Sequence, residues 1–207
     1  MGYIGGANYE DIRNYSGNMH RCYVYGVRNI FDGGNGIFEI DKYDSTSQDN
    51  GGTILIDAIG RRWKRNINGE VLLKWWGVNL NGEKDSINEL TSAAKFASDN
   101  KLPLILPAGV IGITDEFVPP NGLDMRGYGN SLRAGNRFAT TIKWIGDVAI
   151  KKAVIRCSRS PIGVTPTEDV SSVRITNIIA DCDNKATNGF YFRYFTNESH
   201  CDNITAI

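Results

Sequence analysis

The segment Asn177-Ile178-Ile179-Ala180-Asp181-Cys182 is matched twice elsewhere in the chain. Upstream, Val154-Ile155-Arg156-Cys157 aligns with Ile179–Cys182, and downstream Asn203-Ile204 aligns with Asn177-Ile178. The period is roughly 25 residues, within the range of about 20–50 that is typical of solenoid proteins. The pattern predicts a parallel β-solenoid with three short strands per turn. In such a fold, strands stack about 4.8 Å apart and equivalent side chains touch.

Other short apolar runs recur from about residue 123 to the end, separated by polar turns. They are Thr141–Ile145, Ala153–Cys157, Val173–Ala180, Gly189–Phe195 and Asn203–Ile207. This length allows about three coils, and the last run stops in the middle of the pattern. A solenoid needs a cap over its open edge. The pattern therefore predicts the start of a solenoid that is truncated at its rear.

One helix is expected before the repeat, from about Ile87 to Ser98. Ser86 and Glu89 have the spacing of a capping box, and Asp85 adds negative charge at the helix start. One face carries the apolar residues that an amphipathic helix requires, namely Ile87, Leu90, Ala94 and Ala97. We expect this helix to cap the front of the solenoid.

The first region is dense in Gly, Asn and Tyr. Asp32-Gly33-Gly34-Asn35-Gly36 is a strong turn signal, and Ile37–Asp41 alternates apolar and polar residues as a half-buried strand does. We therefore predict a mainly β chain in three parts. Residues 1–80 form a small β-rich connector, residues 81–122 hold the capping helix and first strands, and residues 123–207 start the solenoid.

Composition excludes several classes of function. The chain has 207 residues, 23 basic and 23 acidic, so its balanced charge argues against a general nucleic-acid or anionic-membrane binder. No apolar run approaches the roughly 20 residues that span a bilayer, and the segment Met1–Gly6 lacks the features of a Sec signal. Four cysteines without a CxxC pair and only two histidines argue against zinc. We expect no metal and no cofactor.

Eight motifs share one order and spacing with a known family. They are Asp11–Gly17, Asp32–Phe38, Asp49–Asp57, Gly60–Arg65, Trp75–Val78, Asn81–Ser86, Leu106–Ile113 and Arg126–Gly129. Together they resemble the N-terminal part of bacteriophage tailspikes, polysaccharide depolymerases with a pectate-lyase-like right-handed β-helix. The family usually has Trp-Phe-Gly-Ala where this chain has Trp75–Val78, and Asp-Gly-x-x-Asp-Asp/Asn-Thr near Asn81–Ser86. These changes conserve capping and packing.

The resemblance implies a homotrimer on a phage virion, made in the host cytoplasm. It further implies that the N-terminal region attaches to the tail, the baseplate or an adaptor protein, while the β-helix binds and usually cuts a bacterial surface polysaccharide. Two alternatives stay open: a complete small polysaccharide lyase or glycoside hydrolase, and a non-catalytic adaptor or receptor-binding fibre. Whether this chain is itself an enzyme is left open as well.

Depolymerases of this class are expected to use carboxylates as acid, base or nucleophile. Asp181 and Asp183 alternate on one strand and so share a face, which suits a catalytic pair. The alternative is structural, because the upstream match places Asp181 beside Arg156 and favours an ion pair. Glu198 and His200 flank the last turn, where a surface role is the simpler interpretation.

Three further groups have two interpretations each. Trp75 and Trp76 are candidate carbohydrate-binding residues, or packing residues under the helix and at a subunit contact. The basic run Arg61–Arg65 is a minimal nucleic-acid pattern, but its place in the motif series favours packing or a contact between subunits. Cys157 and Cys182 fall at equivalent repeat positions. They could form a disulfide between coils, or they could be part of a ladder of small buried apolar groups.

Overall fold

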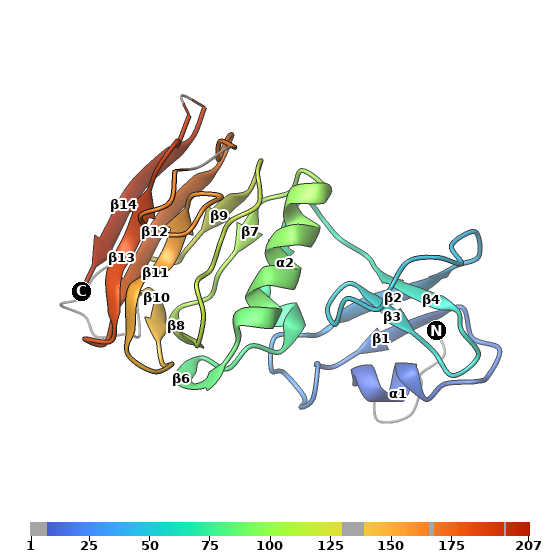
Figure 1. The fold of residues 1–207 in the computed structure, drawn as a ribbon. Coiled ribbons are helices and arrows are strands. Elements are labelled where there is room, and N and C mark those ends of the chain that lie inside the picture. The colour runs from blue at the N-terminus through green and yellow to red at the C-terminus, as the bar shows by residue number, and fades with distance from the viewer. Residues whose placement is uncertain (1–7, 130–138, 166–167, 197) are drawn as a thin grey trace. The chain divides into compact units, whose positions relative to one another are not determined.

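The computed structural model of the chain describes residues 8–129, 139–165, 168–196 and 198–207. It divides into two compact units (Figure 1). The first unit comprises Met1–Asn68 and Lys74–Gly77. The second comprises Gly69–Leu73 and Val78–Ile207. A short 3-10 helix, η1 (Leu73–Trp76), lies where the two units alternate along the chain.

The first unit is built on a four-stranded antiparallel sheet in the order β1-β2-β4-β3. Its strands are β1 (Arg21–Val24), β2 (Gly36–Asp41), β3 (Ile54–Ile56) and β4 (Arg62–Arg65). Alternation on β4 points Trp63 and Arg65 into the unit. The core also contains Phe38 and Leu55.

A short helix that the sequence did not predict, α1 (Tyr9–Arg13), packs against this sheet. Asn8 and Asp11 form a reciprocal capping box at its N-terminus. Tyr9 and Ile12, one helical turn apart, both point into the core. So short a helix cannot show a helical repeat in a sequence, and the expectation of a single helix in the chain was wrong.

The second unit contains parallel strands and one long helix. The strands of its main sheet are β5 (Val71–Leu72), β6 (Asn81–Asp85), β7 (Leu104–Ile105), β8 (Gly109–Ile113), β9 (Asp124–Arg126), β10 (Thr140–Trp144), β12 (Arg174–Asp181) and β14 (His200–Ala206). Their order is β5-β7-β9-β12-β10-β8-β6, with β14 also pairing with β12. A second parallel sheet joins β11 (Ala149–Cys157) to β13 (Ala186–Phe192). Stacked parallel strands joined by turns are the first coils of a β-helix, so the predicted fold class is confirmed (Figure 1).

The predicted register of the coils was only half right. Asn177 lies level with Asn203, and Asn203 Nδ2 donates a 2.6 Å hydrogen bond to Asn177 Oδ1, which confirms the downstream match. The upstream match of Arg156 with Asp181 was wrong, because Asp181 pairs with Lys143 and Arg156 pairs with Tyr191. The coils differ in length, so a nearly constant offset cannot align them.

The strand β12 explains this irregular spacing. Its first half, Arg174–Thr176, pairs with β9, and its second half, Ile178–Asp181, pairs with β10. β9 and β10 therefore pair with successive parts of the same strand. Close packing just after β9 explains Gly127, where a Cβ would lie 2.1 Å from the carbonyl oxygen of Asn177.

The helix α2 (Ile87–Asp99) contacts β5, β7 and β9 at the start of the solenoid. Its buried residues are Leu90, Ala93, Ala94 and Ala97, so Ala93 takes the place predicted for Ile87. The predicted capping box was wrong. The Ser86 side chain makes no cap hydrogen bond, and Asp85 Oδ1 instead accepts from the N–H of Ile87 at 3.1 Å. No helix in the described ranges is both long and apolar enough to cross a membrane.

Candidate binding site in the four-stranded unit

Arg65 is a buried cation at the centre of the first unit, with 6% of its surface exposed. Its guanidinium donates to the carbonyl oxygens of Gly34 (2.6 Å), Asn35 (2.9 Å) and Gly52 (3.2 Å), and to the Tyr9 hydroxyl. No carboxylate pairs with it among the described residues. The backbone therefore solvates this charge in place of water, as a buried charge requires.

Aromatic rings complete the surroundings of Arg65. Its Cζ atom lies 4.6 Å from the ring centre of Trp75 and 4.7 Å from that of Phe38, which are cation–π distances. Burial lowers the pKa of Arg65 and raises the pKa of Tyr9 to about 12. Both groups stay in their ordinary neutral-pH forms, so the cluster is a structural centre rather than a proton-transfer site.

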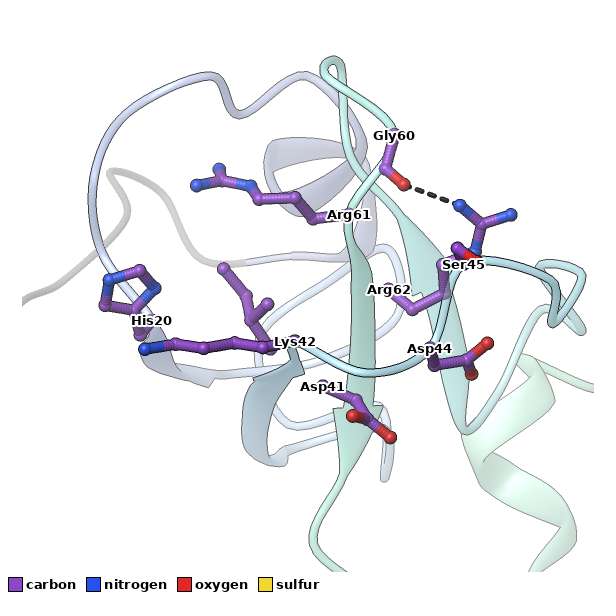
Figure 2. Close-up of a pocket in the computed structure, with 9 residues that line it drawn as sticks. His20, Asp41, Lys42, Asp44, Ser45, Gly60, Arg61 and Arg62 are labelled. Atoms are coloured by element: carbon purple, nitrogen blue, oxygen red, sulfur yellow. Dashed lines mark hydrogen bonds between the residues drawn. The ribbon is translucent and has the colours of Figure 1, made fainter.

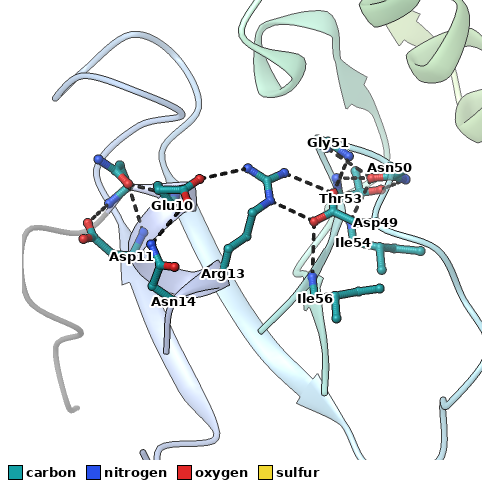
Figure 3. A network of polar contacts seen from close by, with 12 residues as sticks. Glu10, Asp11, Arg13, Asn14, Asp49, Asn50, Gly51, Thr53, Ile54 and Ile56 are labelled. Carbon is teal, nitrogen blue, oxygen red and sulfur yellow. Dashed lines mark hydrogen bonds and ion pairs between the residues drawn. The ribbon is translucent and has the colours of Figure 1, made fainter. Parts of the chain in front are cut away.

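The polar network around Arg13 ties α1 to the loop before β3 (Figure 3). Arg13 binds both carboxylate oxygens of Asp49, from Nε at 2.9 Å and from Nη2 at 3.1 Å. Asn50 Oδ1 accepts three backbone N–H groups, from Gly52, Thr53 and Ile54. This loop thereby places the carbonyl of Gly52 against Arg65.

Most of the cations of the basic run Arg61–Arg65 have partners within the unit. Arg61 Nε lies 2.6 Å from Asp57 Oδ2, and Lys64 Nζ lies 2.8 Å from Asp41 and 2.7 Å from Asp44. Arg62 donates to backbone carbonyls at Ser47 and Gly60. These contacts give the run a packing role, which is one of the two roles, packing or a contact between subunits, that its place in the motif series favoured.

The carboxylate of Asp57 should make the stability of the first unit sensitive to acid. Its buried carboxylate accepts from Trp63 Nε1 (2.9 Å) and from Arg61 Nε (2.6 Å). Burial alone would raise the pKa of Asp57, but these hydrogen bonds outweigh it and lower the pKa below its ordinary value. As pH falls, the unfolded chain is therefore protonated here first, near its ordinary pKa of about 3.9. The stabilisation is complete above about pH 5 and is lost as pH falls through the lowered folded-state pKa.

We expect Asp57→Asn to reduce the free energy of unfolding of this unit by about 2 kcal/mol at pH 7, as for a lost charged hydrogen bond. The difference from the unsubstituted chain should shrink as pH falls below 4. Urea unfolding at several pH values measures it, with exposed Glu39→Gln as the control. A difference that stays constant down to pH 2.5 would contradict this assignment.

A hollow of about 340 Å³ opens on the same unit (Figure 2). We call it the turn hollow, because the turns at residues 41–45 and 57–61 border it. Its lining includes His20, Ile40, Lys42, Asp44, Gly60 and Arg61. His20, Lys42 and Arg61 point toward one side of the hollow, while Asp41 and Asp44 point away from them. It is the candidate binding site of the unit, and no sequence motif predicted it.

The catalytic candidates Asp181 and Asp183 lie at the turn between β12 and β13. Lys143 Nζ is 2.8 Å from Asp183 and 4.0 Å from Asp181, and Lys185 Nζ is 3.1 Å from Asp183. Hydrogen bonds from the two lysines lower the pKa of Asp183. The predicted ion pair of Asp181 with Arg156 was wrong, since Arg156 binds Glu116 at 2.9 Å. Catalysis by the two aspartates stays a prediction.

Trp75 and Trp76 are both buried in the first unit. Trp75 covers the guanidinium of Arg65, and Trp76 Nε1 donates to the Asn50 carbonyl at 2.6 Å. A Cβ at Gly52 would lie 2.4 Å from the Trp76 ring, which explains the glycine there. Both rings pack inside the unit in this arrangement, and carbohydrate binding by Trp75 and Trp76 stays a prediction.

All four cysteines are free thiols. Cys157 faces Phe192 on β13, and Cys182 lies beyond the end of β12, so the two do not occupy equivalent positions as predicted. Burial raises the pKa of Cys157, which makes it an unreactive packing group.

His200 begins β14, and Glu198 accepts from the Ser172 hydroxyl at 2.7 Å. No group of metal-ligating side chains gathers in the described ranges.

These two units define a class of protein, in which a small four-stranded antiparallel sheet precedes the first coils of a parallel β-helix. Residues 7–68 match the family described as the phage tail protein small four-stranded beta-sheet domain. A comparison with curated proteins finds no match in sequence.

Solved phage structures share the fold of nearly the whole chain. A tailspike of Acinetobacter baumannii bacteriophage Fri1, a capsular polysaccharide depolymerase, is 13% identical with a TM-score of 0.69. The alignment covers 97% of this chain and 37% of that one. The enzymatically active domain of tailspike protein 2 from bacteriophage CBA120 is 17% identical with a TM-score of 0.61. That alignment covers 96% of this chain and 26% of the other. The resemblance to the N-terminal portion of tailspikes is thus confirmed, and the chain spans less than half the length of the tailspikes it matches.

Proposed function

We propose that this chain is the N-terminal part of a phage tailspike. Residues 1–80 attach it to the virion tail, and residues 123–207 begin a β-helix that recognises and degrades a host surface polysaccharide. The observation that carries this proposal is the order of the two parts. A phage tail domain match at residues 7–68 is followed by coils that share the fold of a depolymerase tailspike.

The attachment is tested with virions produced without their tailspike. The purified chain is mixed with these particles and sedimented, beside an unrelated β-helix protein as control. We expect the chain to sediment with the particles, and an antibody to the chain to label the tail. A chain that stays in the supernatant at all concentrations would overturn the proposed attachment.

We further propose that the chain assembles as a homotrimer, as the tailspike resemblance implies. Light scattering coupled to size exclusion should give a particle with three times the mass of the 22.9 kDa chain. The polysaccharide activity belongs to the whole protein in this proposal. It is measured on the full gene product as release of reducing ends or unsaturated sugars from host capsule.

A further inference from the structure

The turn hollow contains basic side chains with unused hydrogen-bonding capacity. Lys42 and the ring of His20 make no side-chain hydrogen bond or ion pair in the described part of the chain. Arg61 pairs with Asp57 through Nε and its Nη2 atom is shielded from solvent, but 21% of the side chain is exposed and Nη1 makes no hydrogen bond among the described residues. Three side chains that can bind an anion thus point toward one side of the hollow (Figure 2).

The acidic residues of the hollow do not neutralise that side. Asp41 and Asp44 both bind Lys64, whose hydrogen bonds lower the pKa of each carboxyl. They point away from Lys42 and Arg61 in the same view (Figure 2). An anion approaching His20, Lys42 and Arg61 therefore meets three donors, and the two carboxylates are already engaged.

Two exposed apolar residues are neighbours in sequence of the residues that line the hollow. Tyr43, between Lys42 and Asp44, is 99% exposed, and Ile59, next to Gly60, is 59% exposed. Ile40 lines the hollow itself. Tyrosine is enriched where protein surfaces meet, and Tyr43 offers its ring to such a contact. A ligand with a carboxylate next to an apolar group is complementary to these basic and apolar side chains.

We propose that the turn hollow binds an acidic segment of another protein of the virion tail. A carboxylate of that segment accepts hydrogen bonds from Lys42, His20 and Arg61, and an adjacent apolar side chain packs on Tyr43 and Ile59. The location of the partner rests on the proposed function. A protein is favoured over an acidic sugar because every residue of the hollow lies within the phage tail domain match, residues 7–68.

Two matched peptides test the hollow directly. Acetyl-Glu-Phe-Glu-Leu-Glu-amide carries the proposed chemistry, and the same peptide with Gln for each Glu is neutral. We expect the acidic peptide alone to shift the backbone amide resonances of residues 41–45 and 57–61. Lys42→Glu should weaken its binding about tenfold or more, since a cation becomes a like charge. Exposed Lys95→Glu on α2, which makes the same change in net charge, should leave binding unchanged.

Three results would overturn the inference. These are equal binding of the acidic and neutral peptides, unchanged binding by Lys42→Glu, and shifts confined to other residues. A glucuronate oligosaccharide is titrated in parallel. If it shifts the same amides and the acidic peptide does not, the protein partner is wrong.

The virion experiment separates this inference from the proposed function. If the unsubstituted chain attaches to virions and Lys42→Glu attaches at least tenfold more weakly, both stand. If both chains attach equally, the hollow is not the docking site, although the proposed function holds. If the unsubstituted chain does not attach, the proposed function fails, and the tail partner assigned to the hollow fails with it.

Discussion

Arg65→Ala should cost the first unit about 4 kcal/mol of its free energy of unfolding. The substitution removes the guanidinium from the carbonyls of Gly34 and Gly52, which keep only the long contacts of 3.4 and 3.3 Å from the Tyr9 hydroxyl. It also empties the space between the rings of Phe38 and Trp75. Unpaired buried polar groups cost about 1–3 kcal/mol each, and a cavity adds to that loss. Urea unfolding followed by fluorescence measures the effect, because Trp63, Trp75 and Trp76 all lie in this unit.

Two variants identify the cause. Arg65→Lys keeps the charge but cannot reproduce a planar fork that reaches several carbonyls, so we expect about half of the loss. Arg21→Ala removes an exposed arginine that pairs with Glu39 at 2.9 Å on the same sheet, and it should change stability by less than about 1 kcal/mol. A similar loss for Arg21→Ala and Arg65→Ala would show that Arg65 is not a structural centre.

The burial of Arg65 could be predicted from the sequence, but its contacts could not. Strand alternation places Trp63 and Arg65 on one face of β4 and Arg62 and Lys64 on the other. A buried tryptophan therefore predicts that Arg65 is buried as well. The carbonyls that bind it come from loops around residues 34 and 52, and no local pattern relates those loops to β4.

The turn hollow was unpredictable for a similar reason. His20, Lys42 and Arg61 come from three separate segments, each of which is an ordinary polar turn or strand end in the sequence. Antiparallel pairing of β2 with β4, and a hydrogen bond from the Ile40 N–H to the His20 carbonyl, bring them to one place. Only the folded sheet shows that these three side chains share a hollow.

In the solenoid, the fold class could be predicted and the register could not. Apolar runs separated by turns are enough to indicate stacked parallel strands. Lys143 and its partner Asp181 lie much further apart along the chain than Asn177 and Asn203 do. Turns of different length do not disturb the interior of the solenoid. Because turn length varies between coils, a constant offset along the sequence does not predict which residues pair. Arg156 was consequently assigned to the wrong carboxylate.

The correct partner of Arg156 gives the strongest prediction for the solenoid. Glu116 is 5% exposed and Arg156 is 14% exposed, with Oε2 and Nε 2.9 Å apart. Glu116 Oε1 also accepts from the N–H of Ala153 at 2.8 Å, so one side chain joins two successive coils. Glu116→Ala should reduce the free energy of unfolding of the second unit by about 3 kcal/mol, because a mostly buried guanidinium loses its carboxylate. Amide hydrogen exchange along β11 measures this loss.

Two neighbouring substitutions show whether charge or packing carries the effect. Asp115→Ala removes the adjacent carboxylate, which is exposed and binds Lys152 at 3.0 Å, and should change exchange along β11 by less than tenfold. Glu116→Gln keeps an oxygen for the Ala153 N–H but removes the charge, so its loss should lie between the other two. Since Arg156 also donates to the carbonyls of Ser158 and Ser160, part of its charge stays solvated in every variant. If Glu116→Gln matched the unsubstituted chain, the hydrogen bonds across the coils would carry the stability and the ion pair would add nothing.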